Sequence, residues 1–472
     1  MIKNLLSMKH AHIVLAAFSV IVIFSLRSQS QTRLMATGDN SYIMCSDSTA
    51  SACGQNGSGQ LGNGTGPGPS SNVYVPVSLP GRFVALYGGY EHVLAVKRDS
   101  TLWAWGWNQY GQLGIGNSNN SNAPVQVSSL QGIIAAAGGG THSLALKSDS
   151  TVWSWGWNNY GQLGNGNNSP SNVPVQVSGL TGVIAVAAGE YFSLALKGDG
   201  TVWTWGYNLY GQLGNGNNSN SNVPVQVNGI SFVTAIASHG EHAIALKNDG
   251  TVWTWGRNIE GQLGNGNNSS SNVPVLVNTL PGIISISAGY YHSLALKSDS
   301  TVWAWGRNDA GQLGNGNNTD SNVPVQVNSI SGITAIIAGF WHNLALSSNG
   351  TLWAWGYNYD GELGAGNNSS TNVPVQSSGF CMSLTAVNEQ PPSTISVFPN
   401  PCSASAVIET GKPFTDAVFT VYDPLGQQVQ QQEGLSGNKI EFYRKQLPCG
   451  FYFFSLVQSG QVIASGKLVI QD

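Results

Sequence analysis

Two short segments that recur along this chain carry side chains suited to binding another molecule. Each follows a Trp-Gly pair or precedes a recurrent histidine, and both are rich in aromatic residues and arginine. Such side chains bury a large contact area and are enriched at recognition surfaces. The chemistry expected of them is binding, through stacking, cation–π contact and hydrogen bonds. The candidate partner-binding residues are Trp107, Tyr110, Trp157, Tyr160, Tyr207, Tyr210, Arg257, Arg307, Tyr290, Tyr291 and Trp341.

These positions vary between copies whose neighbouring residues stay constant. The segment after Trp-Gly changes from Trp-Asn-Gln-Tyr at 107–110 to Arg-Asn-Ile-Glu at 257–260, and the pair before the histidine changes from Tyr-Glu at 90–91 to Tyr-Tyr at 290–291. In a repeat protein, constant positions hold the units together and variable ones are free to contact something else. The alternative is that the rings only shield glycine-rich turns at tolerant loop positions. The sequence leaves both interpretations open.

Histidine recurs at the same step, and imidazole is a common metal ligand. A metal site needs donors about 2 Å from one ion, whereas equivalent positions in successive repeats form a ring too wide for that. Phe192 also replaces the histidine in one copy. We therefore expect structural histidines that bond to their neighbouring turns, and no metal or cofactor. The histidines are His92, His142, His242, His292 and His342.

Catalytic constellations are absent from the sequence, so we do not expect an enzyme. No Ser-His-Asp, paired-carboxylate or P-loop arrangement stands out, and the Gly-x-Gly strings precede strands rather than helices. Glycoside hydrolysis would need two carboxylates about 5 to 10 Å apart on one face. Glu260, Asp309 and Asp360 lie at corresponding loops of successive repeats, which keeps a carbohydrate-processing enzyme as an alternative.

The elements that must position these residues repeat at a step of 50. The unit at 182–227 contains four β-type runs, at 183–187, 193–197, 201–205 and 223–227. A tight Asp-Gly type of hairpin joins the second run to the third. Four short strands per repeat are the pattern of a propeller blade rather than of a helical array.

The repeats number seven and fill residues 33 to 377. Trp203 and Trp205 are two residues apart, so both point to one face of their strand and fill the space between blades. The first copy is degenerate and fits once one residue is dropped near Asn40, with Gly38 matching Gly189. We predict an all-β chain, with a seven-bladed β-propeller at 31–378, a linker at 379–394 and a small β-sandwich at 395–472.

The repeat string G-x-x-H-S-L-A-L-K-x-D-G-T-V-W-x-W-G-x-N-x-x-G-Q-L-G-x-G resembles the repeat of the regulator of chromosome condensation family. The resemblance covers about three-quarters of the chain and implies a seven-bladed propeller. It also implies a second alternative, guanine-nucleotide exchange on a small GTPase. Exchange in that family relies on a wedge inserted into one blade, and the constant step leaves no room for one. Propellers host many unrelated activities, so the fold alone assigns no function.

The C-terminal module resembles the type A sorting domain of the type IX secretion system. The resemblance is carried by Pro-Asn-Pro at 399–401, Tyr-Asp-Pro-Leu-Gly at 422–426, Gly-Phe-Tyr at 450–452 and Lys-Leu-Val at 467–469. It implies a Bacteroidetes-type bacterium and engagement of the secretion machinery through residues 395–472. The chain would then pass through the periplasm and be released or attached to the outer cell surface.

The N-terminus and the charge agree with export. Residues 1–30 have the pattern of a signal peptide, with cleavage expected between Ser30 and Gln31. The apolar run at 13–26 is shorter than the ~18 residues that a span needs, so we expect no permanent membrane span. Only 8% of residues are charged and the net charge is −4. Both values disfavour the binding of nucleic acid, which needs clustered cations. We expect a secreted monomer whose partner is an extracellular protein or glycan.

The chain has five cysteines, so at least one is unpaired within it. Cys402 and Cys449 share the C-terminal module, and we expect them to form a disulfide, although sequence alone does not fix connectivity. No C-x-x-C or Cys/His cluster suggests zinc.

Overall fold

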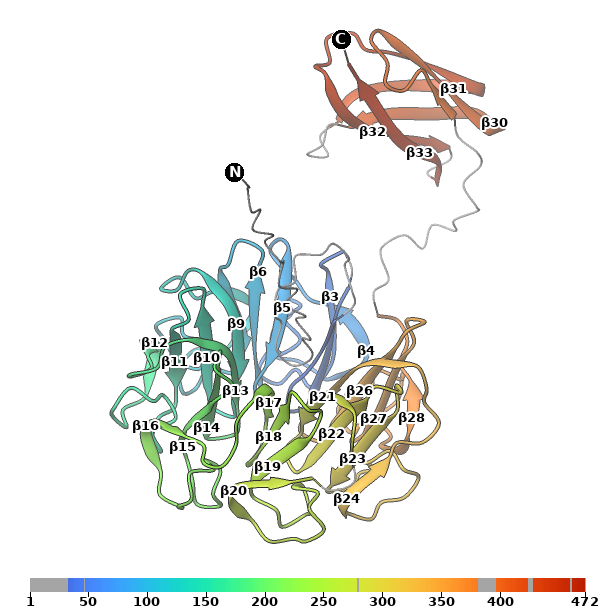
Figure 1. Cartoon of the computed structure of the whole chain (residues 1–472). Coiled ribbons are helices and arrows are strands. Elements are labelled where there is room, and N and C mark those ends of the chain that lie inside the picture. The colour runs from blue at the N-terminus through green and yellow to red at the C-terminus, as the bar shows by residue number, and fades with distance from the viewer. Residues whose placement is uncertain are drawn as a thin grey trace, which may run out of the picture. The chain divides into compact units, whose positions relative to one another are not determined.

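The structure is a computed structural model that describes residues 33–45, 47–277, 280–380, 396–422, 428–458 and 461–471. Two compact units divide the chain after Cys381, and Figure 1 draws the first as a ring of blades coloured in chain order. The expected signal peptide, its cleavage point at Ser30 and Gln31, and most of the expected linker lie outside the described residues.

The first unit contains seven four-stranded antiparallel sheets, each built from four consecutive strands. The prediction of a seven-bladed propeller is confirmed. Blade 1 is β1 (Arg33–Ala36), β2 (Asn40–Met44), β3 (Ala50–Gly54) and β4 (Ser71–Pro76); blade 2 is β5 (Phe83–Gly88), β6 (His92–Lys97), β7 (Leu102–Gly106) and β8 (Ser121–Gln126); blade 3 is β9 (Ile133–Gly138), β10 (His142–Lys147), β11 (Val152–Gly156) and β12 (Ser171–Gln176); blade 4 is β13 (Val183–Ala188), β14 (Phe192–Lys197), β15 (Val202–Gly206) and β16 (Ser221–Gln226). Blade 5 is β17 (Val233–Ser238), β18 (His242–Lys247), β19 (Val252–Gly256) and β20 (Ser271–Leu276); blade 6 is β21 (Ile283–Ala288), β22 (His292–Lys297), β23 (Val302–Gly306) and β24 (Ser321–Gln326); blade 7 is β25 (Ile333–Ala338), β26 (His342–Ser347), β27 (Leu352–Gly356) and β28 (Thr371–Gln376).

The two tryptophans of each blade have different roles. Trp205 is fully buried, and its indole Nε1 donates a hydrogen bond of 2.9 Å to the carbonyl of Gln162 in the preceding blade. Trp203 packs against the same cluster but is only half-buried, and its Nε1 donates to Thr201 Oγ1 at 3.3 Å. The inner tryptophan therefore joins two blades, whereas the outer one covers their edge.

Histidines join neighbouring blades, and they do so through the next strand rather than through their own turns. His92 Nε2 lies 2.8 Å from Ser143 Oγ of the next blade, and His342 Nε2 lies 2.9 Å from Ser41 Oγ, which links blade 7 to blade 1. Where the histidine is replaced by Phe192, the facing position of the next blade is Ala243 instead of a serine or an asparagine. The imidazole and its partner therefore change together. The other bonded pairs are His142 with Ser193, His242 with Ser293, and His292 with Asn343.

Removal of one such partner is expected to weaken the ring. Ser143→Ala removes the side chain that hydrogen-bonds the buried imidazole of His92. The free energy of unfolding should fall by about 1–3 kcal/mol. The double variant H92F/S143A reproduces the pair found at Phe192 and Ala243, so it should recover part of that loss. Urea unfolding at pH 8 measures both. A double variant no more stable than Ser143→Ala would contradict this assignment.

Blade 1 needs no deletion to match the other blades, which corrects the expected alignment. Asn40 pairs with Gly54 as His142 pairs with Gly156, so Asn40 takes the histidine position and Thr37, not Gly38, takes the place of Gly189. Because every blade is made of consecutive strands, the ring closes by packing blade 1 against blade 7 without sharing a strand.

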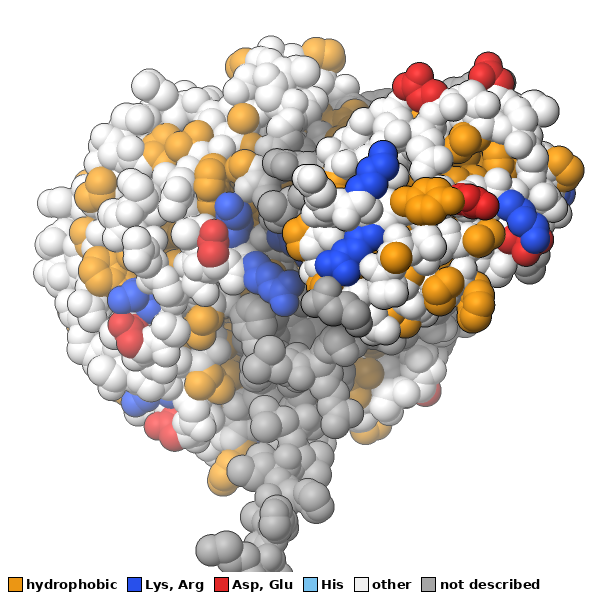
Figure 2. All heavy atoms as spheres, turned by 90° about the horizontal axis from the view of Figure 1, so that it is seen from above, with side chains coloured by type: hydrophobic (Ala, Val, Ile, Leu, Met, Phe, Trp, Pro, Cys, Tyr) orange, Lys and Arg blue, Asp and Glu red, His pale blue; other side chains and the backbone are white. Residues whose placement is uncertain are grey.

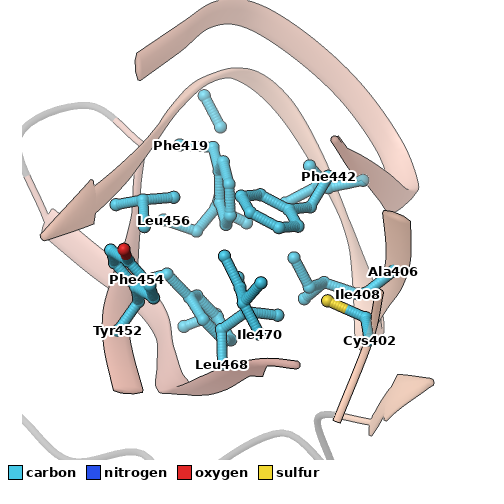
Figure 3. Close-up of a cluster of buried hydrophobic side chains, with 14 of the residues drawn as sticks. Cys402, Ala406, Ile408, Phe419, Phe442, Tyr452, Phe454, Leu456, Leu468 and Ile470 are labelled. Carbon is cyan, nitrogen blue, oxygen red and sulfur yellow. The ribbon is translucent and has the colours of Figure 1, made fainter. Parts of the chain in front are cut away.

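The second unit is a five-stranded antiparallel sheet of β29 (Ser396–Phe398), β30 (Ser405–Tyr422), β31 (Gln428–Tyr443), β32 (Gly450–Gln458) and β33 (Gln461–Ile470). Its long strands β30 and β31 change register at several points. As Figure 3 shows, the strands enclose a core that includes Phe419, Phe442, Phe454 and Leu468. The predicted sandwich is therefore realised as one sheet that wraps around its own core.

The expected disulfide between Cys402 and Cys449 is not formed. Cys402 is a free thiol, 1% exposed, and its sulfur lies among the apolar side chains of the core in Figure 3. Cys449 is exposed, and its sulfur accepts a hydrogen bond of 3.4 Å from Arg444 Nη2. One side chain faces the core and the other faces solvent, so a shared module was not a sufficient reason to pair them. Among the cysteines that the structure describes, Cys45 is the one that takes part in a disulfide.

Candidate functional site

The two variable segments of each blade meet at one end of its second and third strands. In blade 4, β14 and β15 pair so that Phe192 faces Gly206, and the backbone N–H of Tyr207 donates to the carbonyl of Tyr191 at 2.9 Å. The equivalent bond recurs in the other blades at 2.8 to 3.0 Å. Segments that are far apart within the repeat sequence therefore form one continuous loop surface around the ring.

A glycine allows this surface to form. Gly206 has a φ of +107°, and a Cβ atom there would lie 2.6 Å from the carbonyl oxygen of Tyr191 and 2.8 Å from the Cα of Phe192. Only glycine fits both the left-handed backbone and the close approach. The strand can therefore turn directly into the loop that carries the variable side chains.

Aromatic rings of blades 2 to 4 contact one another in an unbroken series. The ring centroids of Trp107 and Tyr110 are 5.3 Å apart, those of Tyr110 and Trp157 are 5.8 Å apart, and those of Trp157 and Tyr160 are 5.2 Å apart. Tyr160 lies 4.7 Å from Tyr207. These edge-to-face and tilted contacts are the arrangements that ring quadrupoles favour. The series thus crosses two blade boundaries.

Arginines form a second series of contacts, which begins at Tyr210 and runs through blades 5 to 7. The Arg257 guanidinium lies 4.1 Å from the ring centre of Tyr291 and 5.7 Å from that of Tyr210. The Arg307 guanidinium lies 5.0 Å from the ring centre of Trp341 and 5.8 Å from that of Tyr291. Cation–π attraction holds such stacks together. We call this surface the aromatic rim; it comprises Trp107, Tyr110, Trp157, Tyr160, Tyr207, Tyr210, Arg257, Tyr291, Arg307 and Trp341.

An inner cluster lies inside the rim. The hydroxyl of Tyr290 donates to Glu190 Oε2 at 2.5 Å, and the Tyr290 ring lies 4.8 Å from Phe340. Phe340 stacks on Tyr90 at 4.9 Å and contacts the His239 ring at 4.4 Å. Burial raises the pKa of Tyr290 above its usual range, so the phenol stays protonated and able to donate. This cluster supports the rim from within. Tyr290 joins the two, because its ring also lies 4.3 Å from that of Tyr291 and 5.2 Å from that of Trp341.

The carboxylates that could serve catalysis each have a polar side-chain partner. Glu260 forms an ion pair with Arg257 at 2.9 Å, and Asp309 forms an ion pair with Arg307. Asp360 accepts a hydrogen bond of 2.6 Å from Ser70 Oγ. Among the described residues, no group of three or more His, Cys, Asp or Glu side chains is arranged to hold a metal ion. These contacts give Glu260 and Asp309 structural roles in their own loops, whereas the Asp360 bond joins blade 7 to blade 1.

The rim is accessible and polar at its edges. Its side chains are half-buried, and Tyr110 is 42% exposed. Flat rings and paired guanidiniums of this kind can bury apolar area and donate directed hydrogen bonds to a partner. The rest of the surface is sparsely charged, and Figure 2 shows a face where blue and red side chains are few and scattered.

Sequence reasoning missed several members of these clusters. Tyr191 lies 5.1 Å from Trp157, and Tyr357 contacts Tyr359 at 4.9 Å. His239 was also missed, although it stands where five other blades have glycine, and this replacement was visible in the repeat alignment. The partner-binding residues predicted from the sequence, by contrast, are brought together by the fold in two contact series at the same end of the blades.

Family models match both units. A model described as RCC1-like domain matches residues 16–234, and two models described as regulator of chromosome condensation (RCC1) repeat match 249–296, 299–346 and 349–383, and 233–262, 283–312 and 333–362. A model described as secretion system C-terminal sorting domain matches residues 396–471. The repeats and the sorting module inferred from the sequence are thereby confirmed.

Solved structures with the same ring include two propellers. Human WBSCR16 aligns with a TM-score of 0.62 and 27% identity over 68% of this chain and 92% of that one. Prp20p from Saccharomyces cerevisiae, described with its binding properties to Gsp1p and histones, aligns with a TM-score of 0.64 and 24% identity over 74% of this chain and 88% of that one. The similarity to Prp20p, at 24% sequence identity, shows a shared fold only.

A curated relative matches only locally. The ultraviolet-B receptor UVR8 of Arabidopsis thaliana is 40% identical over 42 residues, and the match spans 9% of this chain and 10% of the receptor. In the described part of the chain, no helix has the length and apolar character needed to cross a membrane. The sorting domain directs the protein to the cell surface or the extracellular space.

Proposed function

The chain belongs to the regulator of chromosome condensation repeat family and carries a secretion sorting domain, and we propose that it is a non-enzymatic binding protein that acts outside the cell. The aromatic rim recognises an extracellular protein or glycan. The observation that carries this proposal is a pair of contact series, one through the rings of blades 2 to 4 and one that leads from Tyr210 through the two arginines to Trp341.

The arrangement of the rim supports binding over turn-shielding. A ring that only shields its own turn needs no neighbour, yet Tyr110 and Tyr160 each reach the next blade, at 5.8 and 4.7 Å. Such packing fixes the rotamers of exposed aromatic side chains before a partner arrives, which lowers the entropy cost of binding. The hydrophobic rings with a polar margin match the composition of binding hot spots.

A differential capture experiment tests the proposal. The chain from residue 31 onward is immobilised beside a variant with Trp107, Tyr110, Trp157, Tyr160, Tyr207 and Tyr210 changed to Ala, and both are exposed to spent medium and cell-surface extract. We expect one component to be retained by the parent and lost by the variant. Circular dichroism and urea unfolding confirm that the variant is folded. Identical capture by both proteins would overturn the proposal.

Phe232→Asn provides a matched control for the loss of an aromatic side chain. Phe232 is 64% exposed with a φ of +58°, a backbone that asparagine tolerates. It lies against Gly200 in the hairpin at the opposite end of the strands from the rim. Capture by this variant should equal capture by the parent.

A further inference from the structure

The rim is interrupted by a hollow between blades 6, 7 and 1. Its volume is about 760 Å³, and its lining includes Asp39, Ala310, Trp341, Tyr357 and Tyr359. We call it the rim hollow. It lies within the first unit and beside the end of the arginine series, since Arg307 also lines it.

A single small residue accounts for the hollow. Ala310 occupies the place that Tyr110, Tyr160 and Tyr210 occupy in blades 2 to 4. Each of those tyrosines reaches the first rim side chain of the next blade, as Tyr160 does to Tyr207 at 4.7 Å. Alanine has no ring to extend, so the space before the next blade stays open. The hollow therefore lies where blade 6 departs from the repeat pattern, with Ala310 in place of a tyrosine.

The walls of the hollow combine aromatic rings with polar and charged side chains. Tyr357 and Tyr359 contact each other with centroids 4.9 Å apart, and Tyr359 is 70% exposed. Trp341 and Tyr90 add two further rings from blades 7 and 2, and the remaining lining residues include the polar Gln312, Asn318, Ser370, Thr371 and Asn372. Faces of tyrosine and tryptophan attract cations through their quadrupoles, most strongly where water is excluded.

The hollow also carries an uncompensated negative charge. Among the described residues, none forms an ion pair with Asp39 or donates a hydrogen bond to its carboxylate, whereas the Arg307 charge across the hollow is matched by Asp309. Glu91 and Asp360 are close enough to repel the Asp39 charge. Asp39 is half-buried. A carboxylate that is partly removed from water without a donor is costly, and a cationic ligand would remove that cost.

We propose that the rim hollow binds a cationic side chain, a lysine ammonium or an arginine guanidinium, presented by the protein that the rim recognises. This inference rests on the proposed function and narrows the partner to a protein with an exposed basic residue. The cation would lie against the rings of Tyr357, Tyr359 and Trp341 and form a charge-assisted hydrogen bond with Asp39. A neutral saccharide would leave the carboxylate unpaired.

The pH dependence of binding follows from the same groups. Burial, together with Asp360 and Glu91, raises the pKa of Asp39 to about 7, so the carboxyl is mostly protonated at pH 6 and ionised at pH 8. The cation binds the ionised form, so affinity should rise across this interval and binding should release a proton. The other titratable and charged groups facing Asp39 are Glu362, Tyr90, Tyr357, and the Arg307–Asp309 pair across the hollow.

Saturation-transfer NMR with short peptides tests the inference directly. The probes are Gly-Gly-Lys-Gly-Gly and Gly-Gly-Arg-Gly-Gly, with Gly-Gly-Gln-Gly-Gly as the neutral counterpart, and the protein is the chain from residue 31 onward. At pH 8 we expect transfer to the basic side chains and none to glutamine. Asp39→Asn should weaken binding about tenfold or more, as the loss of one charged hydrogen bond does. Ala310→Tyr should abolish it by filling the hollow.

Asp149→Asn is the matched control. It removes the same charge from an exposed hairpin, where blade 7 already has Asn349 accepting the same backbone bond from Thr351 at 3.0 Å. Binding of the basic peptides should be unchanged in this variant. No transfer to either basic peptide, or equal transfer to parent and Asp39→Asn, would overturn the inference. So would binding of a neutral oligosaccharide in its place.

The outcomes separate this inference from the proposed function. The six alanine substitutions of the capture experiment lie on blades 2 to 4, whereas Asp39 and Ala310 lie on blades 1 and 6. If the captured partner is lost by the six-alanine variant and fully retained by both Asp39→Asn and Ala310→Tyr, the rim binds and the hollow does not contribute. If no variant changes capture, both fail.

Discussion

Acidification from pH 6.5 to pH 4 is expected to unfold the propeller. Burial lowers the pKa of six histidines from 6.5, to about 3 for His92, His142, His242 and His342 and to about 4 for His239 and His292. Each is neutral in the folded ring but binds a proton near pH 6.5 once unfolded. Each therefore contributes stability above pH 6.5 that falls by about 1.4 kcal/mol per pH unit below it.

Three carboxyl groups change the folding stability with pH in the direction opposite to that of the histidines. Burial raises the pKa of Asp39 and Glu241 to about 7 and that of Glu362 to about 8. Their contribution to stability is complete below pH 4 and is lost as the pH rises through 7 to 8. Because the histidines outnumber them, stability should be greatest near pH 6.5 and should fall steeply on the acid side.

Urea unfolding at pH 8, 6.5, 5 and 4 measures this dependence. We expect the midpoint to peak near pH 6.5, and the slope below it to correspond to uptake of more than one proton. The variant H92F/S143A should take up one proton fewer. A midpoint that stays level between pH 6.5 and pH 4 would contradict the burial assigned to the histidines.

Trp205→Ala is expected to lower the free energy of unfolding by about 3–5 kcal/mol. Trp205 is fully buried between blades, its indole ring would lie 2.7 Å from a Cβ added at Gly164, and its Nε1 is bonded to Gln162. The substitution leaves a cavity in a tight interface and removes one of the two hydrogen bonds to the Gln162 carbonyl, which Ser193 Oγ still donates to at 2.9 Å. The close fit leaves the neighbouring blades little freedom to collapse into the space.

Trp203→Ala is the internal comparison. Trp203 is half-buried, and Lys197 Nζ covers its ring at 5.7 Å. Its removal should cost clearly less than the removal of Trp205, because part of its surface is already in water. Equal losses for the two variants, measured by urea unfolding at pH 8, would show that the inner and outer positions are wrongly assigned.

The blades could be predicted because their determinants are local. The alternation around Trp203 and the Asp-Gly hairpin specify strands and turns within 50 residues, and the structure places β13 to β16 almost on the expected runs. The candidate rim residues also came from local comparison of copies. Their clustering follows from the ring, which brings equivalent loops of successive blades side by side.

Contacts between blades were not predicted because no single repeat contains them. The partner of His92 is Ser143, 51 residues away, although the joint change of Phe192 and Ala243 could have revealed the pairing. The rim hollow depends on Ala310 in one blade and Asp39 in the blade that closes the ring. Cys402 is held beside β33 by backbone hydrogen bonds with Val469 and Gln471, which are contacts between distant segments that short-range patterns do not record.

The dissociation constant of the captured partner, measured for the parent and for Trp157→Ala, tests the central claim most directly. Trp157 contacts Tyr110, Tyr160 and Tyr191, so its removal should disturb the middle of the rim. We predict a loss of affinity of about 30-fold or more, as for a binding hot spot, and no change for Phe232→Asn. Equal affinity of the parent and Trp157→Ala would contradict recognition through the aromatic rim.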